Sequence, residues 1–586
     1  MQLQSLLRAL PRLSFISRFG SLFPRLPSSS MRIVPVHPVA LTLAVSSLLV
    51  LVYNDQLWSA IFNWWPGRSL HDIVFLGSVA LFLTVLFNLI LQPVAMPRLV
   101  KPVLILVVFT AAGVSYFASA YGAMMDKTMI ANVLETDRRE VGDLINVRFF
   151  ADLVLFGLLP ALVIGLVPLS RASWRREAVI RGGVVLASFA VVGLTAAFFY
   201  QDYASLIRNH REMRFMINPS AAIYGTVRYV TDVPSAMASR FQQVAATVTR
   251  GPIAQREKKK TVLVFVVGET ARADHFSLNG YARKTNPELS KLDIVNFGNV
   301  RSCGTSTAES VPCMFSDLAR EDYSSSGAGS RENLLDILVR GGVNVLWLEN
   351  NSSCKGVCAR VPTEIMWNSG DDTLCDGSEC DDEILLERLR AVLDSTDKDT
   401  IVVLHQIGSH GPSYFKRYPP SFRVFSPTCD TNQLQSCTQD EIVNTYDNSI
   451  LYTDHILAET IGILSKASER FDTAMLYVSD HGESLGENGM YLHGMPYMFA
   501  PDTQKHVPMV AWASEGYARK MSLDMSCLKA EDNNAYSHDN LFHSVLGMFG
   551  VGTDVYRPDL DIAAPCRPGP AVAGVAGLDS VGTGHP

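Results

Sequence analysis

Long apolar runs alternate with short polar connections over the first 200 residues. The apolar runs cover residues 39–58, 73–94, 103–121, 151–168 and 182–199. A helix needs about 20 consecutive apolar residues to cross a lipid bilayer. Buried helices of a soluble core are the alternative, but so many runs of this length are typical of a membrane domain. We therefore expect a five-span transmembrane domain at residues 39–200.

The pattern changes after residue 260 to short β-branched runs separated by stretches with helical periodicity. Four runs are apolar enough to be buried strands, at residues 262–267, 343–348, 401–405 and 474–478. Strands that alternate with helices predict an α/β fold. Each run ends in polar residues, and open α/β sheets bind ligands at the carboxyl ends of their strands. We expect one active-site rim at that edge.

Three further segments complete the expected domain organisation. Residues 1–38 form a basic tail, and residues 201–260 form a polar bridge with an amphipathic stretch at 221–233, expected to lie near the membrane surface. The α/β domain is expected at residues 261–568. Residues 569–586, rich in Gly, Ala, Pro and Val, are expected to form a flexible tail.

Basic residues are distributed asymmetrically among the connections. They gather in the N-terminal tail and after the second and fourth apolar runs. Connections rich in Lys and Arg stay in the cytoplasm, so an odd number of spans takes the α/β domain to the other side. Met31 is an alternative start that would shorten the tail, and the tail lacks the clear apolar core of a signal peptide. The net charge of −7 gives no indication of a nucleic-acid partner.

The cysteines support the same sidedness. All ten lie within the α/β domain, and the apolar runs contain none. Cysteines in an oxidising compartment form disulfides, whereas zinc ribbons need CxxC-type pairs, which are absent from the sequence. Spacing suggests four close pairs with one pair left over: Cys303–Cys313, Cys354–Cys358, Cys375–Cys380, Cys429–Cys437 and Cys527–Cys566.

Side chains of metal-ligand type follow two of the predicted strands. Glu269 lies just after the first strand, and the doublet Asp480-His481 follows the last. Zinc accepts carboxylate oxygens and imidazole nitrogens, and a buried carboxylate needs a cation. A single Glu or His after a strand is usually an ordinary loop residue, so the doublet carries this prediction. Three more residues could hold a second metal, bind a phosphate or support the ligands: His410, His493 and Glu483.

A hydroxyl-rich loop lies between two cysteines, Ser302-Cys-Gly-Thr-Ser-Thr-Ala-Glu-Ser-Val-Pro-Cys313. A hydroxyl becomes a nucleophile when a base or a metal activates it, and a disulfide would restrict the movement of this loop. The spacing does not distinguish between four hydroxyls: Thr305, Ser306, Thr307 and Ser310.

Four motifs, in this order, resemble the phosphoethanolamine transferases that modify lipid A. They are Gly268-Glu-Thr-Ala-Arg-Ala-Asp-His275, Asn279-Gly-Tyr281, Ser302-Cys-Gly-Thr-Ser-Thr307 and Ser479-Asp-His-Gly-Glu-Ser484. The resemblance implies a catalytic α/β/α sandwich of the alkaline phosphatase and sulfatase type. It implies four zinc ligands, which are Glu269, Thr307, Asp480 and His481. Of these, Thr307 is also the implied nucleophile. It also implies a phosphate-side pair, His410 and His493, and substrate-binding residues Asn351, Ser352, Lys355 and Glu483, with His405 on the rim.

The implied reaction is ping-pong, between two lipids at the bacterial inner membrane. Thr307 attacks the phosphorus of phosphatidylethanolamine, diacylglycerol leaves, and a lipid A phosphate then attacks the phosphoethanolamine-threonine intermediate. The implied cofactor is one tightly bound Zn²⁺, with the second pair of ligands available to another. The resemblance further implies a monomer with a periplasmic catalytic domain, and a link to polymyxin resistance through reduced negative charge on lipid A.

Other functions agree less well with the residues. A sulfatase needs Cys or Ser followed by x-Pro-x-Arg, but Gly-Thr-Ser-Thr follows Cys303. A lipoteichoic-acid-type glycerol-phosphate polymerase shares the spans and the threonine nucleophile, but the ten cysteines argue against it. A transporter would show charged or broken spans near the bilayer midplane, and a non-catalytic relative would lack a ligand. One alternative stays open, transfer to a core sugar of lipopolysaccharide or to another periplasmic glycan.

Overall fold

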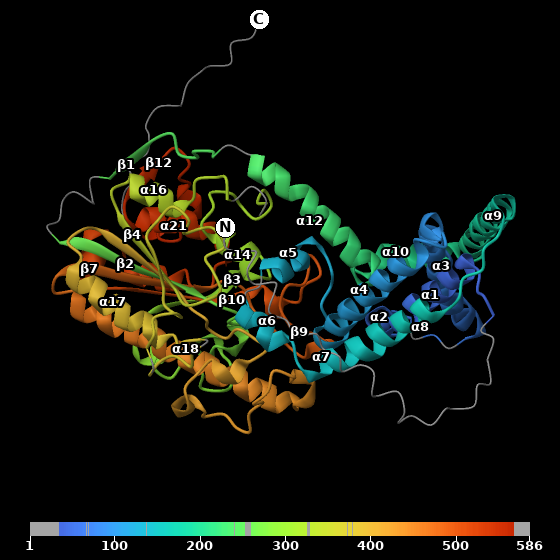
Figure 1. Ribbon diagram of the computed structural model, residues 1–586. Coiled ribbons are helices and arrows are strands. Elements are labelled where there is room, and N and C mark those ends of the chain that lie inside the picture. The colour runs from blue at the N-terminus through green and yellow to red at the C-terminus, as the bar shows by residue number, and fades with distance from the viewer. Residues whose placement is uncertain are drawn as a thin grey trace, which may run out of the picture.

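The computed structural model describes residues 34–567, apart from short gaps at residues 66, 68, 136–137, 239–240, 252–258, 325–328, 372 and 378. Most of the predicted N-terminal tail and the whole predicted C-terminal tail lie outside the described residues. The rest forms a helical part (residues 38–198) and an α/β part (residues 241–567), which lie side by side and are connected by bridging helices (Figure 1).

The helical part contains the predicted apolar spans. Its long helices are α3 (Leu70–Leu91), α4 (Val100–Tyr121), α7 (Val147–Asp152) continued by α8 (Leu159–Leu166), and α9 (Trp174–Phe198). In the described part of the chain, four helices are long and apolar enough to cross a membrane, or five if one bent pair counts as a span. That pair is α1 (Pro38–Val52) and α2 (Asp55–Trp64).

The first predicted span is broken rather than continuous. Helices α1 and α2 meet at an angle of 56°, and Asn54 lies at the break. Its side-chain amide donates to the carbonyl oxygens of Leu49 (2.8 Å) and Asn218 (2.9 Å), and its side-chain oxygen accepts from the backbone N–H of Asn218 (2.8 Å). These bonds satisfy backbone groups that a break inside a membrane would leave exposed.

Bridging helices connect the two parts. They are α10 (Tyr200–Asn209), α11 (Met213–Met216) and α12 (Ser220–Ala238), and the amphipathic stretch expected at residues 221–233 lies within the last of these. Helix α12 packs against α5 (Lys127–Glu135), which follows α4 and is succeeded by α6 (Arg138–Leu144). Strand β1 (Val248–Arg250) pairs with β12 (Val551–Thr553), so the α/β part begins within the expected bridge.

An eight-stranded sheet forms the centre of the α/β part, in the order β11-β3-β10-β7-β2-β6-β4-β5. The four predicted strands are its parallel neighbours β7 (Phe471–Ser479), β2 (Lys260–Gly268), β6 (Thr400–His405) and β4 (Asn344–Glu349). Two strands that the sequence did not reveal, β3 (Val295–Arg301) and β10 (His506–Ala513), run antiparallel to each other. Short strands form the edges, β11 (Tyr536–Ser537) and β5 (Thr363–Ile365).

Both faces of the sheet are covered by helices, which makes an α/β/α sandwich (Figure 1). Leu263, Phe265 and Val267 of β2 face the core shared with α16 (Leu334–Arg340) and α21 (Leu541–Met548). The alternate β2 residues face the core shared with α17 (Glu383–Ser395) and α18 (Gln439–Ala467). The carboxyl ends of the four central strands are in register, with Gly268 opposite Ser479 and His405 opposite Glu349.

Candidate active site

A buried cluster of two carboxylates and one imidazole lies at the carboxyl ends of β2 and β7. Glu269 follows β2, Asp480 and His481 follow β7, and the three side chains are inaccessible to solvent. The His481 Nε2 atom lies 3.3 Å from Glu269 Oε1 and 3.4 Å from Asp480 Oδ2. The Nδ1–H group of His481 donates to the Gly482 carbonyl oxygen at 2.9 Å, which turns Nε2 toward the carboxylates.

Each carboxylate has one oxygen held by the protein and one without a hydrogen bond from the described residues. Asp480 Oδ1 accepts from the backbone N–H groups of Thr270 (3.2 Å) and His481 (2.7 Å), and Glu269 Oε2 accepts from the side-chain amide of Asn351 (2.7 Å). Asp480 Oδ2 and Glu269 Oε1 are the free oxygens. Two free carboxylate oxygens beside an imidazole nitrogen are a donor set that zinc accepts, so the predicted ligands fit a metal ion.

The charges of the cluster also favour a cation. Burial and, next in importance, the nearby charge of Glu269 together raise the pKa of Asp480 to about 7. Burial acts against ionisation of Glu269 too, but the 3.3 Å contact with His481 and the charge of that imidazole hold the pKa of Glu269 well below its usual range. Burial disfavours the imidazolium, yet Asp480 and Glu269 raise the pKa of His481 to about 10. A divalent cation would compensate both carboxylates without added protons.

Thr307 is the hydroxyl that the structure places at this cluster. It is the first residue of α14 (Thr307–Met314), and its Oγ1 donates to Glu269 Oε2 at 3.1 Å and lies 3.4 Å from His481 Nε2. The other hydroxyls of the loop are used differently. Thr305 donates to the Met495 carbonyl oxygen at 2.6 Å, and Ser310 accepts from the Gly304 N–H at 2.9 Å.

Two features hold the predicted nucleophile loop, residues 302–313, in place. The Cys303–Cys313 disulfide closes it, and the other four disulfides join the cysteines that spacing had paired. His538, which no sequence pattern indicated, accepts from the Cys303 N–H and contacts the Ser479 carbonyl oxygen, both at 3.0 Å. A buried imidazole therefore connects the nucleophile loop to the strand that carries Asp480.

The second predicted histidine pair lies beside the first cluster. The rings of His481 and His493 are 4.3 Å apart between centroids, and those of His410 and His493 are 5.6 Å apart. Glu483 is fully buried and lies 2.8 Å from His493 Nδ1, while the Tyr414 hydroxyl donates to its other oxygen at 2.6 Å. The structure thus places Glu483 as a support for His493, and adds Tyr414, which sequence analysis missed. One candidate ligand atom each from His481, Glu483 and His493 lies within 4.8 Å of the others.

The remaining predicted residues occupy different positions around the cluster. Asn351 is buried against Glu269 and also donates to the Gln406 carbonyl oxygen at 2.9 Å. Ser352 and Lys355 lie on the same loop and are both half-buried. His405 is fully buried with its Nδ1 2.9 Å from Glu349, so it supports the rim from inside the protein.

An apolar cavity of about 460 Å³ lies between this cluster and the helical part. His410, Gly411, Leu492 and His493 line its inner end, and Phe109, Gly113 and Phe117 of α4 line it on the membrane side, together with residues of α5, α6 and α7. The site therefore opens toward the predicted bilayer.

The chain matches two family models. Residues 83–233 match the model for phosphoethanolamine transferase EptA/EptB, and residues 261–551 match the sulfatase model. Among curated relatives, phosphoethanolamine transferase EptA of Escherichia coli (strain K12) is 41% identical over 525 residues, which cover 89% of this chain and 95% of the relative. The chain belongs to the EptA family of phosphoethanolamine transferases.

Two further similarities agree with this assignment to the EptA family. Phosphatidylethanolamine transferase Mcr-1 of Escherichia coli is 38% identical over 529 residues, which cover 89% of this chain and 96% of the relative. The integral membrane protein lipooligosaccharide phosphoethanolamine transferase A (EptA) from Neisseria meningitidis matches with a TM-score of 0.87 and 39% identity, over 91% of this chain and 99% of that one. The predicted fold class, membrane helices joined to a sulfatase-like α/β sandwich, is confirmed.

Proposed function

We propose that this EptA-family enzyme transfers phosphoethanolamine from phosphatidylethanolamine to a phosphate of lipid A, from the periplasmic side of a bacterial inner membrane. The observation that carries the proposal is the Thr307 hydroxyl, 3.1 Å from Glu269 in a buried cluster next to an apolar cavity. Two relatives support the substrates by name: Mcr-1 is a phosphatidylethanolamine transferase, and the Neisseria protein modifies lipooligosaccharide. We also propose that the enzyme acts as a monomer.

In the first step Thr307 Oγ attacks the donor phosphorus. A P–Oγ bond forms, the bond from phosphorus to the glycerol oxygen breaks, and the glycerol oxygen takes up a proton as diacylglycerol leaves. We assign that proton to His493, which faces the cavity where the glycerol would lie and is held by Glu483. The hydroxyl proton of Thr307 passes to water in the same step, and water returns a proton to His493 before the next turnover.

Glu269, Asp480, His481 and Thr307 would hold Zn²⁺, and His410 and His493 would bind the donor phosphate or a second ion. The ion supplies a Lewis acid that lowers the pKa of the threonine hydroxyl and offsets the charge on phosphorus. Asn351 orients Glu269 through its 2.7 Å hydrogen bond. Ser352 and Lys355 lie on the loop that follows β4 and would contact the phosphoethanolamine.

In the second step an oxygen of the acceptor phosphate attacks the same phosphorus. The P–Oγ bond breaks and Thr307 regains a proton, which restores the free enzyme. The donor's acyl chains would occupy the cavity between α4 and the site, since its lining is almost wholly apolar. A lipid held there presents its phosphate to the histidine end of the cavity without leaving the membrane.

The experiment that tests the proposal is mass spectrometry of lipid A from cells that express the protein. We expect a gain in mass equal to one phosphoethanolamine, located on a phosphate by fragmentation. Thr307→Ala should abolish the gain while the protein still folds and inserts. Ser306→Ala is the matched control, because it removes the adjacent buried hydroxyl, which has no hydrogen-bond partner among the described residues. A mass gain on the core sugars instead would show the alternative acceptor, and full activity of Thr307→Ala would refute the mechanism.

A further inference from the structure

Three cationic side chains, Arg301, Lys505 and Arg320, lie near the ring of Tyr497 beside the nucleophile loop. Arg301 directly precedes the loop, which begins at Ser302. The Tyr497 hydroxyl donates to the Ser302 carbonyl oxygen at 3.0 Å, and the Ser302 N–H donates to the carbonyl oxygen of Lys505 at 2.8 Å. The third cation, Arg320, is tied to the same region through its backbone N–H, which donates to Asp539 at 2.9 Å. These cations are therefore fixed relative to Thr307.

Two of the three cations have no anionic partner among the described residues. The Arg320 guanidinium carbon lies 3.3 Å from the centre of the Tyr497 ring, and its Nε is buried without an acceptor. The Lys505 Nζ lies 5.2 Å from the same ring centre. Arg301, by contrast, forms an ion pair with Asp502 at 2.7 Å. Stacking on an aromatic ring orients a cation but leaves its N–H donors available.

The electrostatics confirm that positive charge is concentrated here. Burial, together with the like charges of Arg301 and Arg320, lowers the pKa of Lys505 in spite of Asp502. The cluster therefore has unused capacity to bind an anion.

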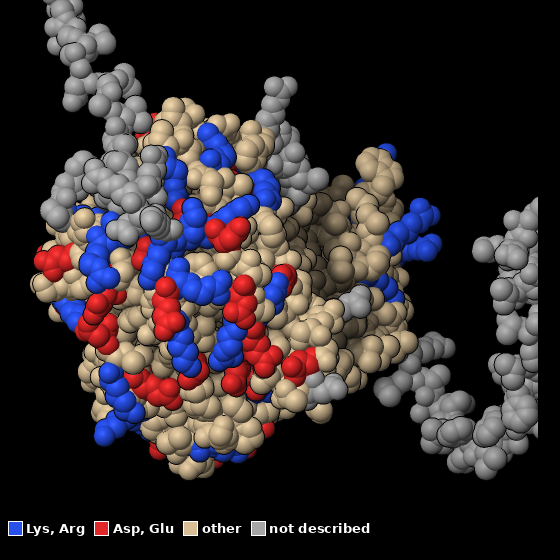
Figure 2. All heavy atoms as spheres, turned by 90° about the vertical axis from the view of Figure 1, so that its left-hand side faces the viewer, with Lys and Arg blue, Asp and Glu red and all other residues tan. Residues whose placement is uncertain are grey.

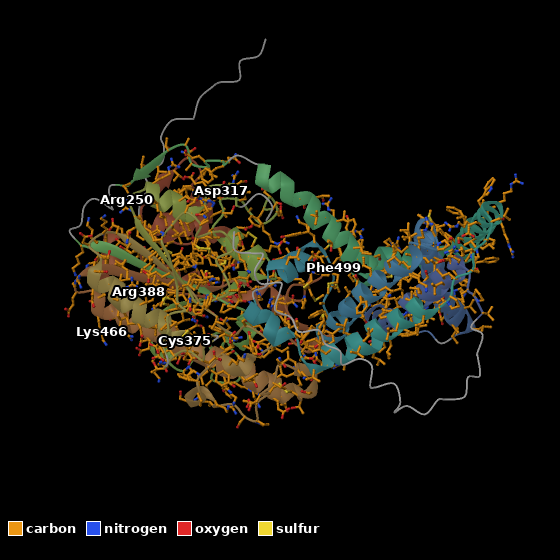
Figure 3. All side chains as sticks on the ribbon, in the orientation of Figure 1. Arg250, Asp317, Cys375, Arg388, Lys466 and Phe499 are labelled. Carbon is orange, nitrogen blue, oxygen red and sulfur yellow. A yellow bond between two sulfur atoms is a disulfide. The ribbon has the colours of Figure 1, made fainter. Side chains whose placement is uncertain are left out.

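The segment that carries Tyr497 reaches the junction between the α/β part and the helical part. Phe499, two residues after Tyr497, lies where the α/β part meets the helical part (Figure 3), with its ring 6.1 Å from that of Phe215 in α11. Met498 beside it is 75% exposed. An aromatic and apolar edge next to cations suits the interface of a bilayer, where lipid phosphates lie above acyl chains.

The cluster is separate from the donor cavity. The cavity lining ends at His493 and Met495 and includes none of the cations or Tyr497. On the face of the α/β part farthest from the helical part, the visible Lys and Arg side chains of the described residues are interspersed with Asp and Glu (Figure 2). A lipid in the cavity and an anion at Tyr497 would therefore approach the nucleophile loop from different sides.

We propose that Arg320 and Lys505, positioned by Tyr497, bind a phosphate of the acceptor lipid and so orient the acceptor toward the phosphorylated Thr307. This inference rests on the proposed function and adds the residues that recognise the second substrate. The attacking phosphate lies at Thr307, so the cluster holds a different phosphate of the same acceptor. Binding uses charge-assisted hydrogen bonds from two cations that have no anionic partner among the described residues.

The two half-reactions separate this role from a role in donor binding. The double variant Arg320→Gln/Lys505→Gln should release diacylglycerol from phosphatidylethanolamine micelles, without acceptor, at the rate of the unmodified enzyme. Its KM for bisphosphorylated lipid A should rise about tenfold or more, as expected for the loss of charged hydrogen bonds. Its kcat should change little. The unmodified enzyme should prefer bisphosphorylated over monophosphorylated lipid A, and the double variant should lose that preference.

Arg470→Gln is the matched control, because Arg470 also lies over an aromatic ring, at 5.0 Å from Phe471, but away from the site. It should behave as the unmodified enzyme, and Arg320→Lys should retain part of the acceptor affinity. An unchanged acceptor KM in the double variant would overturn the inference. So would an equal loss of diacylglycerol release, which would assign the cluster to the donor. If the unmodified enzyme itself releases no diacylglycerol, the proposed function fails and the inference fails with it.

Discussion

The imidazole of His538 bonds to two segments, at Cys303 and at Ser479, that lie more than 170 residues apart in the chain. Its Nδ1 accepts from the Cys303 N–H, so its Nε2 must carry the proton that is donated to the Ser479 carbonyl oxygen. Burial lowers the pKa of His538 to about 3, and therefore this neutral tautomer persists throughout the physiological range. Thr307 and Asp480 both lie within a few residues of these two bonds.

We predict that His538→Ala slows transfer by more than its loss of folding stability explains. Loss of the two buried hydrogen bonds should cost about 1–3 kcal/mol of unfolding free energy. His543→Ala is the control, because His543 is also buried and accepts a backbone N–H, from Arg557 at 3.2 Å, but lies in α21. Thermal unfolding should show similar losses for both variants, and only His538→Ala should slow diacylglycerol release. Equal activity in the two variants would contradict a positioning role for His538.

The residue scale also shows where prediction from sequence stopped. Glu269, Asp480 and His481 could be found because metal-ligand side chains directly follow apolar strands. The choice of Thr307 could not be made by spacing, because it depends on long-range partners such as Met495, which binds the hydroxyl of Thr305. His538 lacked any local pattern, since its role is defined by two distant backbone groups.

At the scale of elements, continuous apolar runs in the α/β part correctly predicted buried strands. The four runs predicted as buried strands are the four central parallel strands, because a strand covered on both faces has apolar residues at every position. Strands β3 and β10 were missed: β3 carries two Asn and a Gly, and β10 contains Pro508. The break after α1 was missed because Asn54 is held there by a hydrogen bond from Asn218, which lies far along the chain.

Helix α14 is short, and the Cys303–Cys313 disulfide joins its last turn to the segment that precedes the helix. Removing this bond with Cys303→Ser/Cys313→Ser should cost about 2–4 kcal/mol in the chain-entropy account and should also slow the first half-reaction. The control is Cys527→Ser/Cys566→Ser, which opens a longer loop with a sequence separation of 39 instead of 10. It should lower the midpoint of thermal unfolding at least as much but leave the catalytic rate per folded molecule unchanged. If the control variant were the slower of the two per folded molecule, this prediction would be contradicted.

At the scale of the whole molecule, the two parts are docked by polar and close contacts around the cavity. Lys416 donates to Asp143 of α6 at 2.9 Å, and the Asn432 side-chain amide donates to the Asp143 carbonyl oxygen at 2.8 Å. Gly122, at the end of α4, has φ = 72°, and a Cβ there would lie 3.3 Å from the Met490 Cα. Glycine is therefore required where the helical part approaches the site loop.

Filling the cavity should impair use of the donor lipid. Gly113→Leu places a bulky side chain in the lining, at a position where a Cβ meets no atom within 4 Å, so the helix itself should tolerate it. We expect the KM for phosphatidylethanolamine to rise about tenfold, the factor that corresponds to 1.4 kcal/mol of lost binding. Gly77→Leu in α3 is the control, since Gly77 is equally free of neighbours but lies outside the lining. A normal donor KM in Gly113→Leu would place the acyl chains elsewhere.

The order of the cysteines has a consequence for how the protein is made. Every disulfide joins two cysteines that are consecutive along the chain. A polypeptide that enters an oxidising compartment from its N-terminal side can therefore form each bond as the second partner arrives, without any rearrangement. We predict that cells lacking a disulfide isomerase but retaining the oxidant produce the protein with native pairing, as peptide mapping under non-reducing conditions would show. Biogenesis of this transferase would then depend on one redox enzyme instead of two.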